Sequence, residues 1–351
     1  MEYNNVESFR KIWIDILKLV ALMGVITIHV VSERWRTVLP DSFDGIILNF
    51  LNGISRFCVP IFVMCSGCFF CNPERKQLLE KLYKKYCFRL LLAYLFFSMF
   101  YALYPAVFQM RSGETVEIGK IISDVYEGAY HLWYIPMLLG LYILVPVFRC
   151  IVTDKNVTRY LVSLLFVLSI LLPTLEQYAH INFFSLLCAK LDYNDSIKYS
   201  VYFILGYVLD QQCCSQNSRK IIYILGIIGT IITIVGNQLI SHDSGKMTEM
   251  MFSYLSLNVF FSSIALFIYF RQRIAFTKMP DTIKKFVEKT SSFVFGIYLV
   301  HPFVINIMLK IGFMKENFSA MITPVLVIIV FGVSYLLTQI LKKIPLLKEI
   351  L

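Results

Sequence analysis

The sequence predicts an all-α, polytopic integral membrane helical bundle with about ten transmembrane helices and both termini in the cytoplasm. Of its 351 residues, 58% are hydrophobic and only 16% are charged, whereas soluble domains are roughly 45–50% apolar and about 25% charged. The net charge of +10 falls in short basic runs between long apolar segments, the pattern of loops on one side of a bilayer. A lipid bilayer is therefore the expected partner, and nucleic acid is not.

Ten segments qualify as candidate spans, because a transmembrane helix needs about 20 mainly apolar residues. The sixth is the shortest, and it could re-enter the membrane or lie partly buried. No linker, internal repeat or nucleotide-binding glycine loop is visible, so residues 1–351 are expected to form a single membrane domain. The candidates are 12–31, 46–70, 88–109, 131–151, 158–178, 197–210, 221–241, 252–270, 291–311 and 320–341.

The distribution of basic residues predicts the orientation of these spans. With the N-terminus inside, the inner segments hold 22 of the 33 Lys and Arg residues and the outer loops hold nine. This bias favours both termini in the cytoplasm. Among the cysteines, only Cys188 then falls in an outer loop, while Cys213 and Cys214 lie near an inner loop, where thiols stay reduced.

Two small-residue patterns in the spans are better explained by packing than by a cofactor. Cys65, Cys68 and Cys71 have the spacing of an iron–sulfur site, but they lie three apart on an apolar helix without an obvious fourth ligand. We therefore expect them to be packing residues and expect no metal. The glycines Gly67 and Gly296 would allow neighbouring helices to approach closely.

Ionisable groups inside a span are costly and are therefore functional candidates. The first span carries Asp15, Lys18 and His29. Lys18 and His29 are eleven residues apart, close to three helical turns, so they share a face at a separation of roughly 16 Å. This arrangement suits a site reached from both sides of the membrane. The alternative for Asp15 and Lys18 is that they reach the inner headgroup layer by snorkelling.

His29 is the candidate catalytic base, because an imidazole accepts a proton near neutral pH. Glu33 lies one turn further on, where its carboxylate could bond the ring and hold its tautomer, as the third member of a triad does. The alternative is a histidine whose hydrogen bonds are satisfied within the helix bundle.

Four sequence segments, taken in order, resemble the acyltransferase-3 family of membrane sugar O-acyltransferases. WIDILKLVALMGVITIHV places Asp15, Lys18 and His29 at the positions of the family's opening motif. SRFCVPIFVMCSGCFF resembles its Val-Pro and Ser-Gly pattern, HLWYIPMLLGLYILVPVF its His-Leu-Trp-Tyr segment, and FGIYLVHPFV its Tyr-Leu-x-His segment. The resemblance covers essentially the whole chain.

The basic residues depart from the family pattern at two places. The family often has two arginines separated by two residues at the start of the third span. Here the second is Arg89, while Tyr86 stands at the first position beside Lys84 and Lys85. Lys18 also replaces an arginine, and lysine offers a point charge without a planar fork.

The resemblance implies transfer of an acyl group, usually acetyl, from cytoplasmic acyl-coenzyme A to a hydroxyl of an extracytoplasmic or lipid-linked glycan. It implies a multi-pass protein of a bacterial plasma membrane, acyl-coenzyme A as a co-substrate, and no tightly bound cofactor. Direct transfer and a histidine-linked intermediate both fit, and the oligomeric state is open. The expected catalytic residues are His29, Asp15, Lys18 and Glu33. The expected substrate-binding residues are Arg89, Lys85, Lys84, Arg56, Ser66, His131, Trp133, Tyr134, Glu176, Tyr298 and His301.

Three other functions use similar residues. A transporter or glycan flippase also buries charges and histidines, although many transporters have Gly/Pro-broken spans in corresponding halves, which this sequence lacks. A non-catalytic module could keep the fold, because fold does not settle function. The same fold could also acylate an acceptor that is not a sugar.

Overall fold

A computed structural model describes residues 11–351 except 112, 114, 116, 180–181, 191–193, 213, 275–278 and 316. Arg10 and Cys213 lie outside the described residues. Within the described part, 80% of the chain is helical and no strand occurs, which confirms the all-α fold class.

The helices are joined mostly by short connections, and three of them contain π-helical turns (η1, η2 and η3). In chain order they are α1 (Ile12–Trp35), α2 (Phe43–Ile54), α3 (Cys58–Phe70), α4 (Lys76–Lys81), η1 (Leu82–Cys87), α5 (Phe88–Arg111), α6 (Ile118–Glu127), α7 (Tyr134–Ile143), α8 (Val145–Ile151), α9 (Lys155–Phe166), η2 (Val167–Leu171), α10 (Leu172–Ala179), α11 (Asn182–Lys190), α12 (Asp195–Lys198), α13 (Ser200–Gln211), α14 (Gln216–Ile231), η3 (Ile232–Gly236), α15 (Asn237–Ser244), α16 (Leu257–Gln272), α17 (Asp281–Ser291), α18 (Val294–Lys310), η5 (Ala320–Ile322), α19 (Thr323–Leu341) and α20 (Pro345–Ile350).

Six described helical stretches are long and apolar enough to cross a membrane. Two bent pairs raise the number to eight if each pair is one span: α7 with α8, bent by 53°, and α17 with α18, bent by 61°. The chain is therefore a multi-pass membrane protein. The six stretches are Ile12–Trp35, Phe43–Phe70, Leu79–Met110, Lys155–Tyr178, Gln216–Ser244 and Ala320–Leu341.

The predicted count of about ten spans is not confirmed, because two predicted segments form short helices. Segment 197–210 gives α13 with 12 residues, and segment 252–270 gives α16 with 16. At 1.5 Å per residue these helices reach about 18 Å and 24 Å, less than the roughly 30 Å of a bilayer's hydrocarbon core. Both are apolar, and both pack against other helices: α13 against α3, and α16 against α14.

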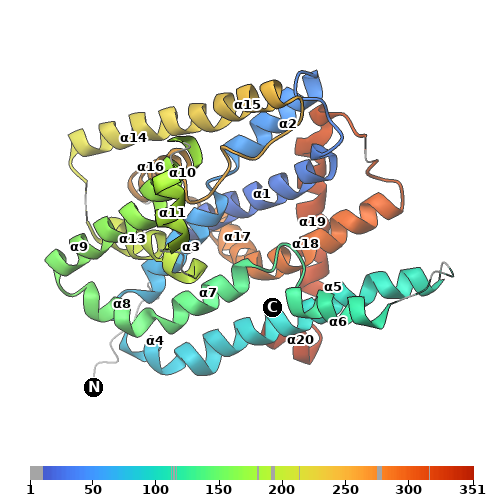
Figure 1. Cartoon of the computed structure of the whole chain (residues 1–351). Helices are drawn as coiled ribbons and strands as arrows, with labels where there is room; N and C mark the ends of the chain where they lie inside the picture. The colour runs from blue at the N-terminus through green and yellow to red at the C-terminus, as the bar shows by residue number, and fades with distance from the viewer. Residues whose placement is uncertain are drawn as a thin grey trace.

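Helix α1 runs through the middle of the bundle, with the continuous α14–α15 helix on one side and α5 on the other (Figure 1). It contacts α2, α3, α16, α17, α18 and α19. Helix α6 folds back along α5 (Figure 1). This central position explains how Asp15 can be buried in α1 at 6% exposure.

Gly67 and Gly296 each allow a neighbouring helix to approach closely, as predicted. A Cβ atom on Gly67 would lie 1.8 Å from the main-chain oxygen of Phe203 in α13, and one on Gly296 would lie 2.3 Å from Thr338 of α19. The thiol of Cys68 donates to the Gly206 carbonyl of α13 at 3.1 Å. Cys68 thus contributes to the packing of α3 on α13.

The orientation of the termini stays a prediction, and Gln216–Ser244 offers a direct test because it is one continuous candidate span. In intact cells, a membrane-impermeant thiol reagent should modify Ser244→Cys, at the outer end, and should reach Cys214 only after permeabilisation. Cys188 is a poor reporter, because burial and then Glu176 raise the pKa of its thiol to about 11. Rapid labelling of Cys214 in intact cells would reverse the assignment.

Candidate active site

A cavity of about 360 Å³ lies along α1 and is bounded by α1, α3, α5, α7 and α18. We call it the first cavity. Lys18 lines one end and His29 the other, about 16 Å away along α1. The predicted shared face of these two residues is therefore the face that α1 turns toward the first cavity. Between the two ends the wall is largely apolar and aromatic, with Val25 of α1 and Phe62 of α3.

Two histidines from distant parts of the chain meet at the His29 end. Nδ1 of His29 lies 2.8 Å from Nε2 of His301, and Nδ1 of His301 lies 3.2 Å from the Ile297 carbonyl oxygen. A carbonyl only accepts, so Nδ1 of His301 carries a proton and its Nε2 accepts when the ring is neutral. His29 then donates through Nδ1 and keeps a lone pair on Nε2. This geometry assigns His29 the tautomer that a base needs.

A third histidine, His131, completes this end of the first cavity. Its side chain is buried, and its ring centroid lies 6.4 Å from that of His29 and 5.9 Å from that of His301. The Tyr298 hydroxyl donates to the His131 main-chain oxygen and holds the segment in place. Within the described part of the chain, neither ring nitrogen of His131 makes a hydrogen bond of normal geometry, and the nearest main-chain interaction is with Leu299. A buried polar ring at a cavity wall can gain a hydrogen bond from a bound ligand.

Pro302 and Tyr101 explain the local shape of α18 beside His301. Proline interrupts a helix because it lacks an N–H and clashes with the carbonyl of the preceding turn. The Tyr101 hydroxyl of α5 enters this interruption: it accepts from the Phe303 N–H at 3.2 Å and donates to the Leu299 carbonyl at 2.8 Å. Its ring also meets His131 at 4.8 Å. Tyr101 therefore ties α5 to both histidine-bearing segments.

The Lys18 end of the first cavity is polar. Ser291, at the end of α17, lines it and donates to the buried Asp15 carboxylate at 2.7 Å. Arg89 lines it too, and its Nε donates to the Ile350 oxygen at 2.9 Å and its Nη2 to the Leu351 oxygen at 2.5 Å. Arg89 thus joins α5 to α20 while its side chain stays beside the first cavity.

Arg56 is buried in the turn between α2 and α3, close to the first cavity and not in its wall. Its Nη2 donates to Asn52 Oδ1 at 2.6 Å and lies 3.9 Å from Glu249 Oε2. The guanidinium carbon lies 5.8 Å from the ring centroid of Tyr254, which does line the first cavity. Arg56 therefore faces the bundle interior, as a buried membrane arginine should.

The remaining predicted substrate-binding residues fall into two groups. One group lines the first cavity: Ser66, Trp133, Tyr134 and Tyr298. The other group lies elsewhere: Lys84 and Lys85 are exposed on η1, and Glu176 lies beside Cys188.

Glu33 lies in the last turns of α1. Its pairing with His29 stays a prediction, and Nδ1 of the ring is bonded to His301.

Sequence reasoning missed several residues of the first cavity, notably Tyr86, Tyr142, Tyr254 and Ser291, as well as Tyr101 behind it. The available signal was weak, because tyrosine is common in this chain, with 21 residues. A hydroxyl placed within an apolar span, as in Tyr101 and Tyr142, is the feature that could have identified them.

These features define an integral membrane protein with an internal cavity that joins a polar end to a histidine cluster. A family model described as an acyltransferase domain matches residues 11–339. The chain belongs to this family, the acyltransferase-3 family of the sequence resemblance, and the family together with the apolar helices supports a membrane acyltransferase. No curated protein matches the chain, and no solved structure does.

Proposed function

We propose that this protein transfers an acyl group, usually acetyl, from cytoplasmic acyl-coenzyme A to a hydroxyl of an extracytoplasmic or lipid-linked glycan at a bacterial plasma membrane. The bond between His29 and His301, at one end of a cavity whose other end holds Lys18, is the observation that carries this proposal. The cavity gives a cytoplasmic donor a route to a base near the opposite face of the membrane.

The chemistry follows from the tautomer of His29. Its Nε2 lone pair takes the proton of the acceptor hydroxyl as the oxygen attacks the thioester carbonyl carbon. The carbon–sulfur bond then breaks, and the proton passes from His29 to the leaving thiolate, which departs as coenzyme A. In this proposal His131, whose ring nitrogens make no hydrogen bond of normal geometry among the described residues, donates to the carbonyl oxygen as negative charge develops there.

His301 acts in this scheme as a positioning residue, because it orients the His29 ring without touching substrate. We expect His301→Ala to lower kcat by roughly 10²-fold, the low end of what a positioned base contributes, with little change in the KM for acetyl-coenzyme A. Coenzyme A release by purified protein in lipid vesicles, with a glycan acceptor on the lumenal side, measures both constants.

The matched variant His301→Gln separates positioning from packing. The glutamine amide oxygen can accept the hydrogen bond of His29 Nδ1–H, so most of the lost kcat should return. Equal losses in Ala and Gln, together with a lower melting temperature in both, would assign His301 to packing. Mass spectrometry of surface glycans from cells with and without the protein then identifies the acylated acceptor, and unchanged acylation would argue against a glycan.

A further inference from the structure

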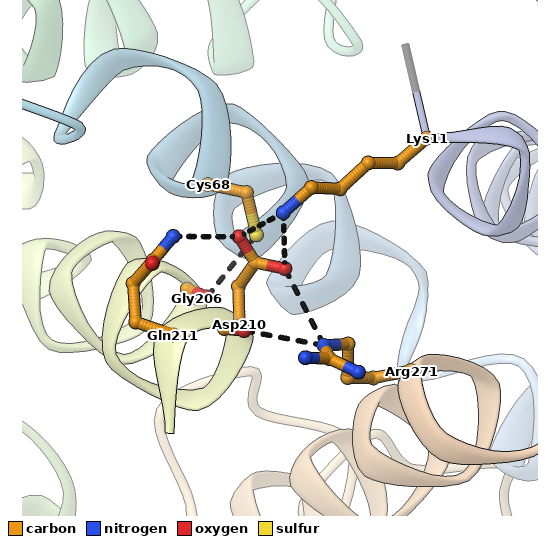
Figure 2. A network of polar contacts seen from close by, with 6 residues as sticks. All are labelled: Lys11, Cys68, Gly206, Asp210, Gln211 and Arg271. Atoms are coloured by element: carbon orange, nitrogen blue, oxygen red, sulfur yellow. Dashed lines mark hydrogen bonds and ion pairs between the residues drawn. The ribbon is translucent and has the colours of Figure 1, made fainter. Parts of the chain in front are cut away.

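A cluster of charged residues marks the level at which α1 begins and two other helices end (Figure 2). Lys11 directly precedes α1, Asp210 lies in the last turn of α13, and Arg271 lies in the last turn of α16. The Lys11 ammonium lies 2.7 Å and 2.6 Å from the two Asp210 carboxylate oxygens, and Arg271 Nε lies 3.5 Å from one of them. Ionised groups are costly inside a bilayer, so a membrane surface lies near this cluster.

Helix α17 meets the bundle at the same level. The hydroxyl of Ser291, its last residue, donates to the carboxylate of Asp15 at 2.7 Å, and Asp15 lies in the first turn of α1. Helix α17 is bent by 61° from α18, and a bend of this size turns it from the direction of the span toward the membrane plane. Helix α18 has 17 residues, the lower limit of what crosses a bilayer, so it can cross without α17.

The sequence of α17 is amphipathic. At about 100° per residue, Ile283, Phe286 and Val287 fall on one side of the helix, and Lys284 and Lys289 flank that side. The opposite side carries the other charged residues of the helix, Asp281, Lys285 and Glu288. Ile283 is 51% exposed and Phe286 is 65% exposed. Two large apolar side chains therefore face away from the protein, with a lysine on either side of them.

We propose that α17 lies along the bilayer surface as an interfacial helix, with Ile283 and Phe286 among the acyl chains and Lys284 and Lys289 at anionic phospholipid headgroups. Interfacial helices combine an apolar side with basic residues and bind anionic membranes through both. A lysine at the edge of the apolar side reaches the headgroups along its own methylene stem. The bond from Ser291 to Asp15 then holds the polar end of the first cavity at the level of the headgroups. This inference does not depend on acyl transfer.

Tryptophan fluorescence of the full chain in lipid vesicles tests the position of α17. The emission that Phe286→Trp adds to that of the wild-type protein should be quenched by phosphatidylcholine brominated on its acyl chains and protected from acrylamide in the water. Lys285→Trp is the matched variant on the opposite side of the helix. Acrylamide should quench its added emission, and the brominated chains should not. The three native tryptophans are common to the wild type and both variants, so the difference removes their emission.

The charge of the lipid tests the contacts with headgroups. At the same low mole fraction in phosphatidylcholine vesicles, brominated phosphatidylglycerol should quench the Phe286→Trp emission about twofold more strongly than brominated phosphatidylcholine, because lysines attract anionic lipid. Adding Lys284→Gln and Lys289→Gln should remove this excess, and so should high salt. Lys155→Gln is the matched control, because it removes the same charge from an exposed residue at the start of α9, and it should keep the excess.

Three results would overturn the inference. Quenching of the Phe286→Trp emission by acrylamide and not by the brominated chains would place α17 in water. Protection from both quenchers would show that protein covers this side of the helix, as a second copy of the chain would. Equal quenching by the two brominated lipids would show that the lysines do not select anionic headgroups. A melting temperature equal to that of the wild type shows that each variant is folded.

Discussion

His29→Gln is expected to insert and fold normally and to lose roughly 10²-fold or more of acyl transfer. Glutamine can still donate its amide N–H to Nε2 of His301, so the contact between α1 and α18 survives. Its amide cannot take a proton at neutral pH, so the acceptor hydroxyl keeps its proton. His29→Ala should lose a similar amount. Coenzyme A release per folded protein measures both variants.

His242 provides the matched control for this substitution. It is exposed at the end of α15, outside the first cavity, and its Nδ1 lies 2.6 Å from Asp41 Oδ1. His242→Gln should therefore retain full turnover. Near-normal turnover in His29→Gln would make His29 a packing residue, and the proposed base mechanism would be wrong.

The sequence alone predicts which face of α1 lines the site. It does not predict which residues of other helices contact that face. Lys18 and His29 share a face because the helical period alone requires it, and both line the first cavity. The partner of His29 Nδ1 is 272 residues away in the chain. Spacing along α1 suggests only Glu33 as a partner for the His29 ring. The contact with His301 depends on how α18 packs against α1, which the local sequence does not reveal.

Charge alone also could not show which basic residues face a cavity. Lys84 and Lys85, expected at the donor site beside Arg89, are exposed on η1 and are not among the residues that line the first cavity. A π-helical turn inserts a residue and shifts the helical register, and a role of the two lysines in donor binding stays a prediction. Arg75, just before α4, was not among the expected residues, yet its guanidinium lies 4.5 Å from the ring centroid of Phe69, which lines the first cavity. The predicted count of about ten spans is not confirmed for a related reason. Hydropathy detects apolar segments, and the short helices α13 and α16 are apolar and pack against other helices.

The crossing of α3 and α13 carries the second large expected effect. Gly67 of α3 lies against α13, and Gly206 of α13 lies against α3. A Cβ on Gly67 would lie 1.8 Å from the main-chain oxygen of Phe203, and one on Gly206 would lie 2.1 Å from the main-chain oxygen of Met64. Backbone atoms cannot move aside as a flexible side chain can. Gly67→Ala and Gly206→Ala should therefore each destabilise the fold by about 1–3 kcal/mol or more, seen as a lower melting temperature in detergent.

Gly332→Ala is the matched control, because Gly332 lies within α19 and a Cβ there meets no atom within 4 Å. Alanine is favoured over glycine inside a helix by about 1 kcal/mol, so this variant should be neutral or more stable. The same substitution thus has opposite expected signs at the two places. Because α3 supplies one wall of the first cavity, the Gly67 and Gly206 variants should also lose acyl transfer. Equal melting temperatures for all three variants would show that α3 and α13 can separate without cost, contrary to the crossing described above.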